Sequence, residues 1–211
     1  LGRPEILRRA VELWKVPAEV RVVDSVEQAE PSPGVIPCLR CGPAEAADVA
    51  PGVIDARSGQ AAYDAVVAAA RLALDGRLDA LTTAPLHKEA LQKAGHLYPG
   101  HTELLAEMCG VDQFAMMLYL GPDAGSSTPG PPDGLVVVHV TLHTAMKNVF
   151  AELTQDAVLE KTRLADRFMT RLAGRRPRIG VCALNPHGGE GGLFGQEEQA
   201  VIRPAVAVAL E

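Results

Sequence analysis

The pattern of hydrophobic positions predicts alternating helices and strands in the first part of the chain. Apolar residues three and four positions apart predict a helix over residues 4–14, and β-rich apolar runs predict strands at 20–23 and 35–39. An alanine-rich stretch predicts a long helix that begins with Ser58 as its cap and ends at Leu74, before Asp75 and Gly76. Its residues are small almost all round, which suits close packing against a sheet.

The same pattern continues to the end of the chain. It predicts a strand at 79–82, a helix over 103–109 that ends at Gly110, and strands at 114–120 and 135–140 that could pair antiparallel. The Gly- and Pro-rich residues 121–134 between these strands predict a flexible surface loop. A helix from Thr154 to Gly174, a strand at 178–184 and a helix over 197–210 follow. We therefore predict one domain of the α/β class, a layered sheet with helices on both faces.

Composition and charge narrow the class of partner. The 211 residues are 47% hydrophobic and 22% charged, as in ordinary globular proteins, and the formal net charge is −6. A nucleic-acid-binding surface needs basic charge, so we expect no nucleic acid partner. No apolar window is long enough to span a membrane, and the first residues do not resemble a signal peptide. Since the sequence does not begin with Met, we expect a fragment of a longer protein.

Four cysteines raise the question of a metal site. Cys38 and Cys41 form a single Cys-x-x-Cys pair, whereas Cys109 and Cys182 are isolated in apolar contexts. A structural zinc site needs two such pairs or nearby histidines. We therefore interpret all four as ordinary reduced cysteines, and expect a cytoplasmic protein.

Three predicted strands end in polar, titratable residues. The first leads into residues 83–102, the second into 138–147 and the third into 184–195. In α/β folds ligands bind at the carboxyl ends of strands, so these three junctions could form one site. His143 and His187 each follow a strand and could both bind a metal ion. The alternative is that each is an ordinary loop histidine.

The third junction is the least ordinary stretch of the sequence. Residues 185–192, Asn-Pro-His-Gly-Gly-Glu-Gly-Gly, include glycines whose N–H groups can approach a substrate. The carboxylate of Glu190 could orient a bound group or ligate a metal ion. It matches no nucleotide-binding fingerprint. A mobile glycine turn is the alternative, but a bare turn does not need Asn, His and Glu among its glycines.

The first junction offers groups suited to a phosphate. His101 and Thr102 open a helix, where free N–H groups attract anions, although either residue could simply cap that helix. Lys88 is either a solvated residue or a cation near the crevice, and the same alternatives hold for Lys147. His139 lies within an apolar strand and is interpreted as a buried histidine with its hydrogen bonds satisfied. His87 and His96 carry no specific signal.

Taken together, these motifs resemble the PdxA family, the 4-hydroxythreonine-4-phosphate dehydrogenases and their relatives. The matching segments are Thr-Ala-Pro-Leu-His-Lys at 83–88, Pro-Gly-His-Thr-Glu at 99–103, Leu-His at 142–143 with Lys147, and Leu-Asn-Pro-His-Gly-Gly-Glu-Gly-Gly at 184–192 followed by Gly195, Glu197 and Glu198. The last segment is the most specific. The likeness covers most of the chain from about residue 53 onward.

The resemblance implies a fold like that of isocitrate and isopropylmalate dehydrogenases and a homodimer with shared active sites. It implies oxidation of a phosphorylated hydroxy acid by NAD or NADP, followed by decarboxylation, in pyridoxal phosphate biosynthesis. In that family three histidines hold a divalent ion, either Zn, Mg or Co, and two of them map onto His143 and His187. The substrate contacts map onto His101 and Thr102, and Lys88 and Glu190 are the candidate catalytic residues.

The sequence also departs from the family. The N-terminal strand with its Gly-Asp-Pro-Ala-Gly-type motif and the last third, which carries the third histidine, are absent, so residues 1–211 are expected to be a partial catalytic region. No residues of the nucleotide site could be assigned. Thr-Ala-Pro, where other members have Thr-Gly-Pro, also occurs in relatives acting on sugar-acid phosphates such as threonate or erythronate 4-phosphate. A non-catalytic remnant of the fold, and a hydrolase using His143, His187 and Glu190, remain alternatives.

Overall fold

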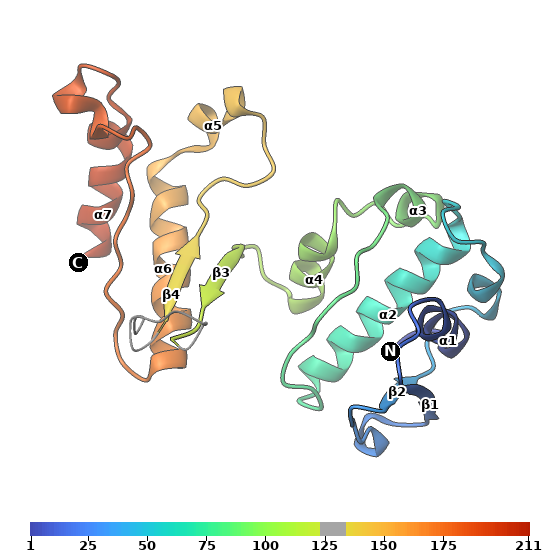
Figure 1. The fold of residues 1–211 in the computed structure, drawn as a ribbon. Helices are drawn as coiled ribbons and strands as arrows, with labels where there is room; N and C mark the ends of the chain where they lie inside the picture. Colours follow the sequence, from blue (N-terminus) through green and yellow to red (C-terminus); the bar gives the residue numbers. More distant parts are fainter. Residues whose placement is uncertain (123–133) are drawn as a thin grey trace. The chain divides into compact units, whose positions relative to one another are not determined.

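The protein is described by a computed structural model that covers residues 1–122 and 134–211. It divides into two compact units, Leu1–Asp112 and Gln113–Glu211, which are built from helices and short strands (Figure 1). This confirms the α/β class predicted from the sequence. Most of the loop predicted at 121–134 lies outside the described residues.

The first unit opens with a helix and a small parallel sheet. Helix α1 (Pro4–Leu13) is followed by β1 (Glu19–Val23) and β2 (Val35–Leu39), which pair in parallel from Glu19 opposite Val35 to Val23 opposite Leu39. Short 3₁₀ segments, η1 (Val26–Gln28) and η2 (Ala44–Asp48), flank β2 in sequence. The predicted helix and both predicted strands are confirmed.

Helix α2 (Ala56–Leu74) is the long alanine-rich helix, but its start differs from the prediction. Asp55 is the N-cap, because its carboxylate accepts a hydrogen bond of 2.8 Å from the Arg57 N–H. The prediction of Ser58 as the cap is therefore wrong. The helix ends at Asp75, and Gly76 then adopts a φ of 72°, as the stop signal predicted.

The prediction that the small residues of α2 pack against a sheet is wrong, because they mainly allow contact with other helices. At Gly59 the helix touches the backbone of α3 (Lys88–Lys93), since a Cβ there would lie 1.9 Å from the Ala90 carbonyl oxygen. Helix α4 (His101–Cys109) also packs against α2 and ends at Gly110 in the left-handed conformation, as predicted. Close helix–helix contact is thus what the small residues allow.

Residues 78–87, between α2 and α3, form neither helix nor strand. The prediction of a strand at 79–82 is wrong for this structure, because a strand needs a hydrogen-bonded neighbour. Among the described residues no ladder partner lies beside this segment. The start of the first junction, residues 83–87, is therefore an extended connection.

The second unit contains an antiparallel ribbon and three helices. Strand β3 (Met117–Leu120) pairs with β4 (Leu135–Val138), as predicted, and α5 (Met146–Glu152) follows. Helix α6 (Gln155–Ala173) is capped by the Thr154 hydroxyl, which accepts from the Ala157 N–H at 3.1 Å, and closes at Gly174 with a φ of 67°. Both ends of α6 match the prediction.

The last part of the second unit differs in two ways from the expectation. Residues 178–184 form no strand, so that prediction is wrong, for the same lack of a ladder partner among the described residues. The predicted final helix forms as a π-helical segment, η4 (Glu198–Ile202), continued by α7 (Arg203–Ala209). Pro204 lacks the N–H that a regular helix would use, which fits the change of register there.

A small core holds the second unit together. Leu153, Val158 and Ala205 are buried, with Val140 and Val181 packed against them. The described residues contain two separate two-stranded sheets, so the layered arrangement with helices on both faces stays a prediction.

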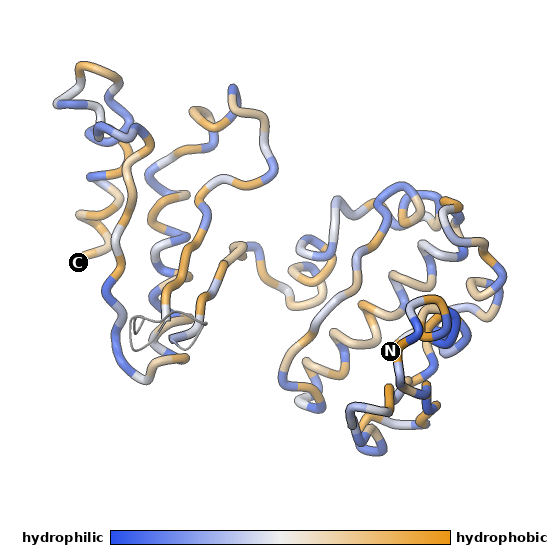
Figure 2. Tube along the Cα trace, in the orientation of Figure 1, coloured by the Kyte–Doolittle hydropathy of each residue, from blue (hydrophilic) through white to orange (hydrophobic). Residues whose placement is uncertain are grey.

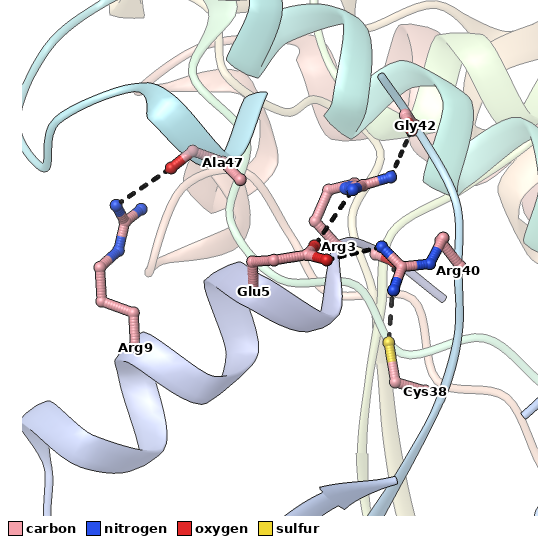
Figure 3. Close-up of polar contacts among 8 residues, drawn as sticks. Arg3, Glu5, Arg9, Cys38, Arg40, Gly42 and Ala47 are labelled. Atoms are coloured by element: carbon pink, nitrogen blue, oxygen red, sulfur yellow. Dashed lines mark hydrogen bonds and ion pairs between the residues drawn. The ribbon is translucent and has the colours of Figure 1, made fainter. Parts of the chain in front are cut away.

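A charged network fastens α1 to the end of β2 (Figure 3). The Glu5 carboxylate forms ion pairs with Arg40 at 2.6 Å and with Arg3 at 3.2 Å, and Arg3 also donates to the Gly42 carbonyl at 3.3 Å. The hydrogen bond from Arg40 is the main cause that lowers the pKa of Glu5 from 4.5 to about 2. The ionised form of Glu5 therefore stabilises the fold.

Replacing Glu5 with glutamine is expected to change how stability depends on pH. A carboxyl group whose pKa is lowered by folding adds stability above its unfolded pKa and loses it as the pH falls through its folded pKa. Between pH 4.5 and about 2, the melting temperature of the wild type should therefore fall further than that of Glu5→Gln. Thermal unfolding followed by circular dichroism measures this. Glu12→Gln, at an exposed site of the same helix, is the control, and an identical profile for Glu5→Gln and wild type would contradict the prediction.

Candidate functional site

The glycine-rich segment at 185–195 forms a tight loop ahead of η4. Within it, η3 (Gly188–Gly192) has several positive φ angles. Gly189 is buried with a φ of 73°, and a Cβ there would lie 3.0 Å from both Glu198 Oε2 and the Gly195 carbonyl oxygen. Only glycine fits this position, because the backbone conformation and the limited space both exclude a side chain.

His187 is presented by this loop with a carboxylate beside it. Its side chain is 69% exposed, and its Nδ1 lies 3.2 Å from Glu190 Oε1. Its backbone N–H donates to Asn185 Oδ1 at 2.8 Å, which fixes the start of the loop. A histidine whose Nδ1 faces a carboxylate can offer Nε2 to a metal ion, the usual arrangement in metal sites.

His143 lies at the second junction, between β4 and α5, and is exposed. Its φ is 52°, and that of Glu190 is 43°. Among the described residues only Lys15 is a further non-glycine residue with positive φ, so two of the three are candidate site residues. Such backbone conformations are costly and concentrate at functional sites.

Both junctions of the second unit lie at the same end of that unit. Figure 1 shows the connection from β4 to α5 and the glycine-rich loop at this end. Lys147, in the first turn of α5, is exposed. Within residues 1–122 and 134–211, no group of three or more His, Cys, Asp or Glu side chains could hold a metal ion. His143 and His187 each carry imidazole nitrogens, a donor type that binds metal ions, on exposed loops of this unit.

The first unit contains a cavity of about 350 Å³ beside the first junction. Val66 and Ala69 of α2 form part of its apolar wall, and Thr82, Thr83 and His101 add polar groups. The structure thus brings His101, Thr82 and Thr83 to the lining of one cavity. Neither Thr82 nor Thr83 was predicted as a site residue, although both are hydroxyl residues at the end of an apolar run.

The first turn of α4 is open to a ligand. Gly100 is the N-cap and offers no side chain to the N–H groups of this turn. The interpretation that His101 or Thr102 caps the helix is therefore wrong, since both lie inside the first turn. Thr102 is exposed, and Lys88, the first residue of α3, is exposed as well.

The other histidines have local contacts. His87 caps α3, because its Nδ1 accepts from the Ala90 N–H at 3.4 Å. His96 stacks on Tyr63 with ring centroids 3.5 Å apart and lies 3.0 Å from Gln60 Oε1. His139 was expected to be satisfied, but its buried Nδ1 has no hydrogen-bond partner among the described residues, so that interpretation is wrong.

The four cysteines are free, as predicted. Cys38 is buried, and burial raises the pKa of its thiol, as it does for Cys41. Neither thiol is therefore activated as a nucleophile. None of the described helices has the length and apolar character that crossing a membrane requires.

The chain is similar to known dehydrogenases. The solved structure of 4-hydroxythreonine-4-phosphate dehydrogenase from Klebsiella pneumoniae matches with a TM-score of 0.87 at 39% identity, over 98% of this chain and 60% of that one. The model of the family "Pyridoxal phosphate biosynthetic protein PdxA" matches residues 1–211. The chain belongs to the PdxA family.

Two kinds of curated relative are similar to this chain at nearly equal identity. A 4-hydroxythreonine-4-phosphate dehydrogenase from Geobacter metallireducens is 42% identical over 99% of this chain and 58% of the relative. A D-threonate 4-phosphate dehydrogenase from Pectobacterium atrosepticum is 39% identical over 98% of this chain and 60% of the relative. The chain thus spans about 60% of the length of these relatives.

Proposed function

We propose that this chain is part of a metal-dependent, NAD- or NADP-linked dehydrogenase that oxidises and decarboxylates 4-phosphohydroxythreonine in pyridoxal phosphate biosynthesis. Membership of the PdxA family across residues 1–211 is the observation that carries the proposal. The fold of the intact protein would then be the layered, isocitrate-dehydrogenase-like one. Since its cysteines are free, we place the protein in the cytoplasm.

The residues of the second unit would hold the cation. His143 and His187 would each supply one imidazole nitrogen, and Glu190 would keep the His187 ring in place through its 3.2 Å contact with Nδ1. A bound Zn²⁺, Mg²⁺ or Co²⁺ would supply a Lewis acid that polarises the substrate hydroxyl and carboxylate. The loop N–H groups freed by the glycines can bind further oxygen atoms of the substrate.

The first unit, taken by itself, has groups that would bind a phosphate. His101 faces the cavity, and the uncapped first turn of α4, which includes Thr102, can donate N–H groups to phosphate oxygens. Lys88, which is exposed on the same unit, would add a further positive charge. In a chain with a formal net charge of −6, such local positive groups are what would attract an anionic substrate.

D-threonate 4-phosphate is the second candidate substrate. The Pectobacterium atrosepticum relative named for it is 39% identical, against 42% for the Geobacter metallireducens 4-hydroxythreonine-4-phosphate dehydrogenase. This small difference does not separate the two substrates, which share a phosphate and a hydroxy acid. The two reactions can be separated only by measuring both.

We further propose that the intact protein is a homodimer. Leu118 and Leu120 of β3 and their partners Val137 and Leu135 of β4 lie on one face of the ribbon and are 47–56% exposed. Figure 2 shows β4 as hydrophobic along its length. An apolar face of this kind is normally covered, and a second copy would cover it. The mass in solution tests this proposal.

The complete gene product that contains these residues should reduce NAD or NADP when given 4-phosphohydroxythreonine and a divalent metal. The expected result is a rise in absorbance at the nicotinamide wavelength, with a higher kcat/KM for 4-phosphohydroxythreonine than for D-threonate 4-phosphate. The reverse ratio would assign the second substrate. No turnover of either substrate with NAD or NADP, in a preparation that binds zinc, would reject the dehydrogenase and favour a non-catalytic protein.

A further inference from the structure

Glu198, the first residue of η4, is buried and lies beneath the glycine-rich loop. It is 6% exposed, and it is the one charged side chain that is buried in the part of the chain described here. Burial of a carboxylate is costly unless other groups compensate for the lost water. The interactions of Glu198 should therefore matter to the loop above it.

One carboxylate oxygen of Glu198 holds the start of the loop. Oε1 accepts a hydrogen bond of 2.9 Å from the Asn185 backbone N–H. This bond is the main cause that lowers the pKa of Glu198, with its own N–H, the Leu184 N–H and the charge of Arg203 adding to the effect. Glu198 is thus bonded as a carboxylate to the residue where the extended segment turns into the loop.

From Asn185 the bonding continues to the metal-ligand candidate. The side-chain oxygen of Asn185 accepts a hydrogen bond from the His187 N–H at 2.8 Å, and the backbone carbonyl of Asn185 accepts one from the Gly188 N–H at 2.8 Å. His187 Nδ1 in turn faces Glu190. The imidazole is therefore connected to Glu198 through Asn185, without touching it.

The second oxygen of Glu198 fills the space under the loop. Oε2 is buried and has no hydrogen-bond partner among the described residues. A Cβ at Gly189 would lie 3.0 Å from it, so loop and carboxylate are in close contact. An unpaired buried oxygen costs free energy, so an apolar side chain at position 198 would stabilise the fold more than this carboxylate does.

We propose that Glu198 is a positioning residue that sets the orientation of His187 through Asn185. The inference rests on the proposed function for the role of His187 as a metal ligand. It adds a residue outside the metal and substrate contacts of that proposal. The carboxylate acts on the backbone of the loop, so its removal should weaken metal binding without removing a ligand.

The test compares Glu198→Ala, Glu198→Gln and the control Gln199→Ala in the complete gene product. Gln199 is the next residue of the same segment and is exposed. Zinc affinity is measured by competition with a chromophoric chelator, and the visible spectrum of bound Co²⁺ reports the geometry of the ligands. Loss of a group that orients a ligand typically weakens metal binding by about 10–100-fold, so we expect this loss and an altered cobalt spectrum for Glu198→Ala. Glu198→Gln keeps an acceptor oxygen and should restore most of the affinity.

Thermal unfolding separates positioning from stability. If Glu198→Ala melts at a lower temperature but binds zinc as tightly as the wild type, with an unchanged cobalt spectrum, the residue is only structural and the inference is overturned. If Glu198→Ala does not fold, Glu198→Gln decides the question. Wild-type zinc affinity and cobalt spectrum in Glu198→Gln support the acceptor role. A loss of zinc affinity as large as that of His187→Ala contradicts it. A wild type that binds no zinc or cobalt rejects the proposed metal site, and this inference with it.

Discussion

His187→Ala is expected to lower the zinc content of the complete gene product from about one ion per site to near zero, and to reduce kcat/KM by about 100-fold or more. In the proposed site the variant would remove one imidazole ligand, a larger loss than that of a group that only orients a ligand, for which about 10–100-fold is typical. His187 is exposed, so the substitution leaves no cavity in the core. The measurements are zinc content by elemental analysis and initial rates with added metal.

The matched control for this prediction is Leu193→Ala. Leu193 lies in the same loop and is 73% exposed, but it carries no metal-binding atom. It should keep its zinc, and His143→Ala should lose zinc as His187→Ala does. Unchanged zinc content in His187→Ala would remove His187 from the site. Loss in His187→Ala alone would remove His143 and leave the loop as the source of the ligand.

The helices could be predicted from the sequence because their signals are local. Thr154 and Gly174 bound α6 as predicted, and Gly110 ends α4, since each cap depends on residues within one turn. Ser58 was predicted as the cap although Asp55, one turn earlier, is an equally strong capping residue, and the sequence does not choose between them. Local signals thus give the elements, with errors of one turn at their ends.

The strands at 79–82 and 178–184 could not be predicted in the same way. An apolar run shows that a segment can form a strand, but the ladder needs a partner elsewhere in the chain. Residues 35–39 have that partner in β1, whereas the two failed segments have none among the described residues. Pairing is a long-range property, which a single sequence does not reveal.

The candidate site, like the fold, could be predicted only in part from the sequence. The sequence pointed to His187 and Glu190 from the unusual company of a histidine and an acid among glycines, and the structure brings the two into contact. It gave no role to Glu198, because a carboxylate at the start of a helix is ordinarily a solvated residue. Its burial arises only when the loop folds over it.

Gly59→Ala is expected to destabilise the first unit, although alanine is the better helix former. Within a helix the exchange of glycine for alanine gains up to about 1 kcal/mol. At Gly59 the added Cβ would lie 1.9 Å from the Ala90 carbonyl oxygen and 2.3 Å from its carbon, both backbone atoms that no change of rotamer can move. Overpacking of this kind costs about 1–3 kcal/mol or more, so the steric term should exceed the helix propensity. Thermal or urea unfolding of the 211-residue chain measures the difference.

The control for this contact is Ser58→Ala, the neighbouring position of α2, which gains helix propensity without a new contact to Ala90. Equal or greater stability of Gly59→Ala would contradict the packing of α2 on α3. The contact would also affect the proposed site, since Ala90 lies in the first turn of α3, which begins with Lys88. If α3 moves away to accommodate the Cβ, Lys88 moves with it. A higher KM for the phosphorylated substrate in Gly59→Ala, at a temperature where the variant is folded, would then show that the α2–α3 contact holds Lys88 in place.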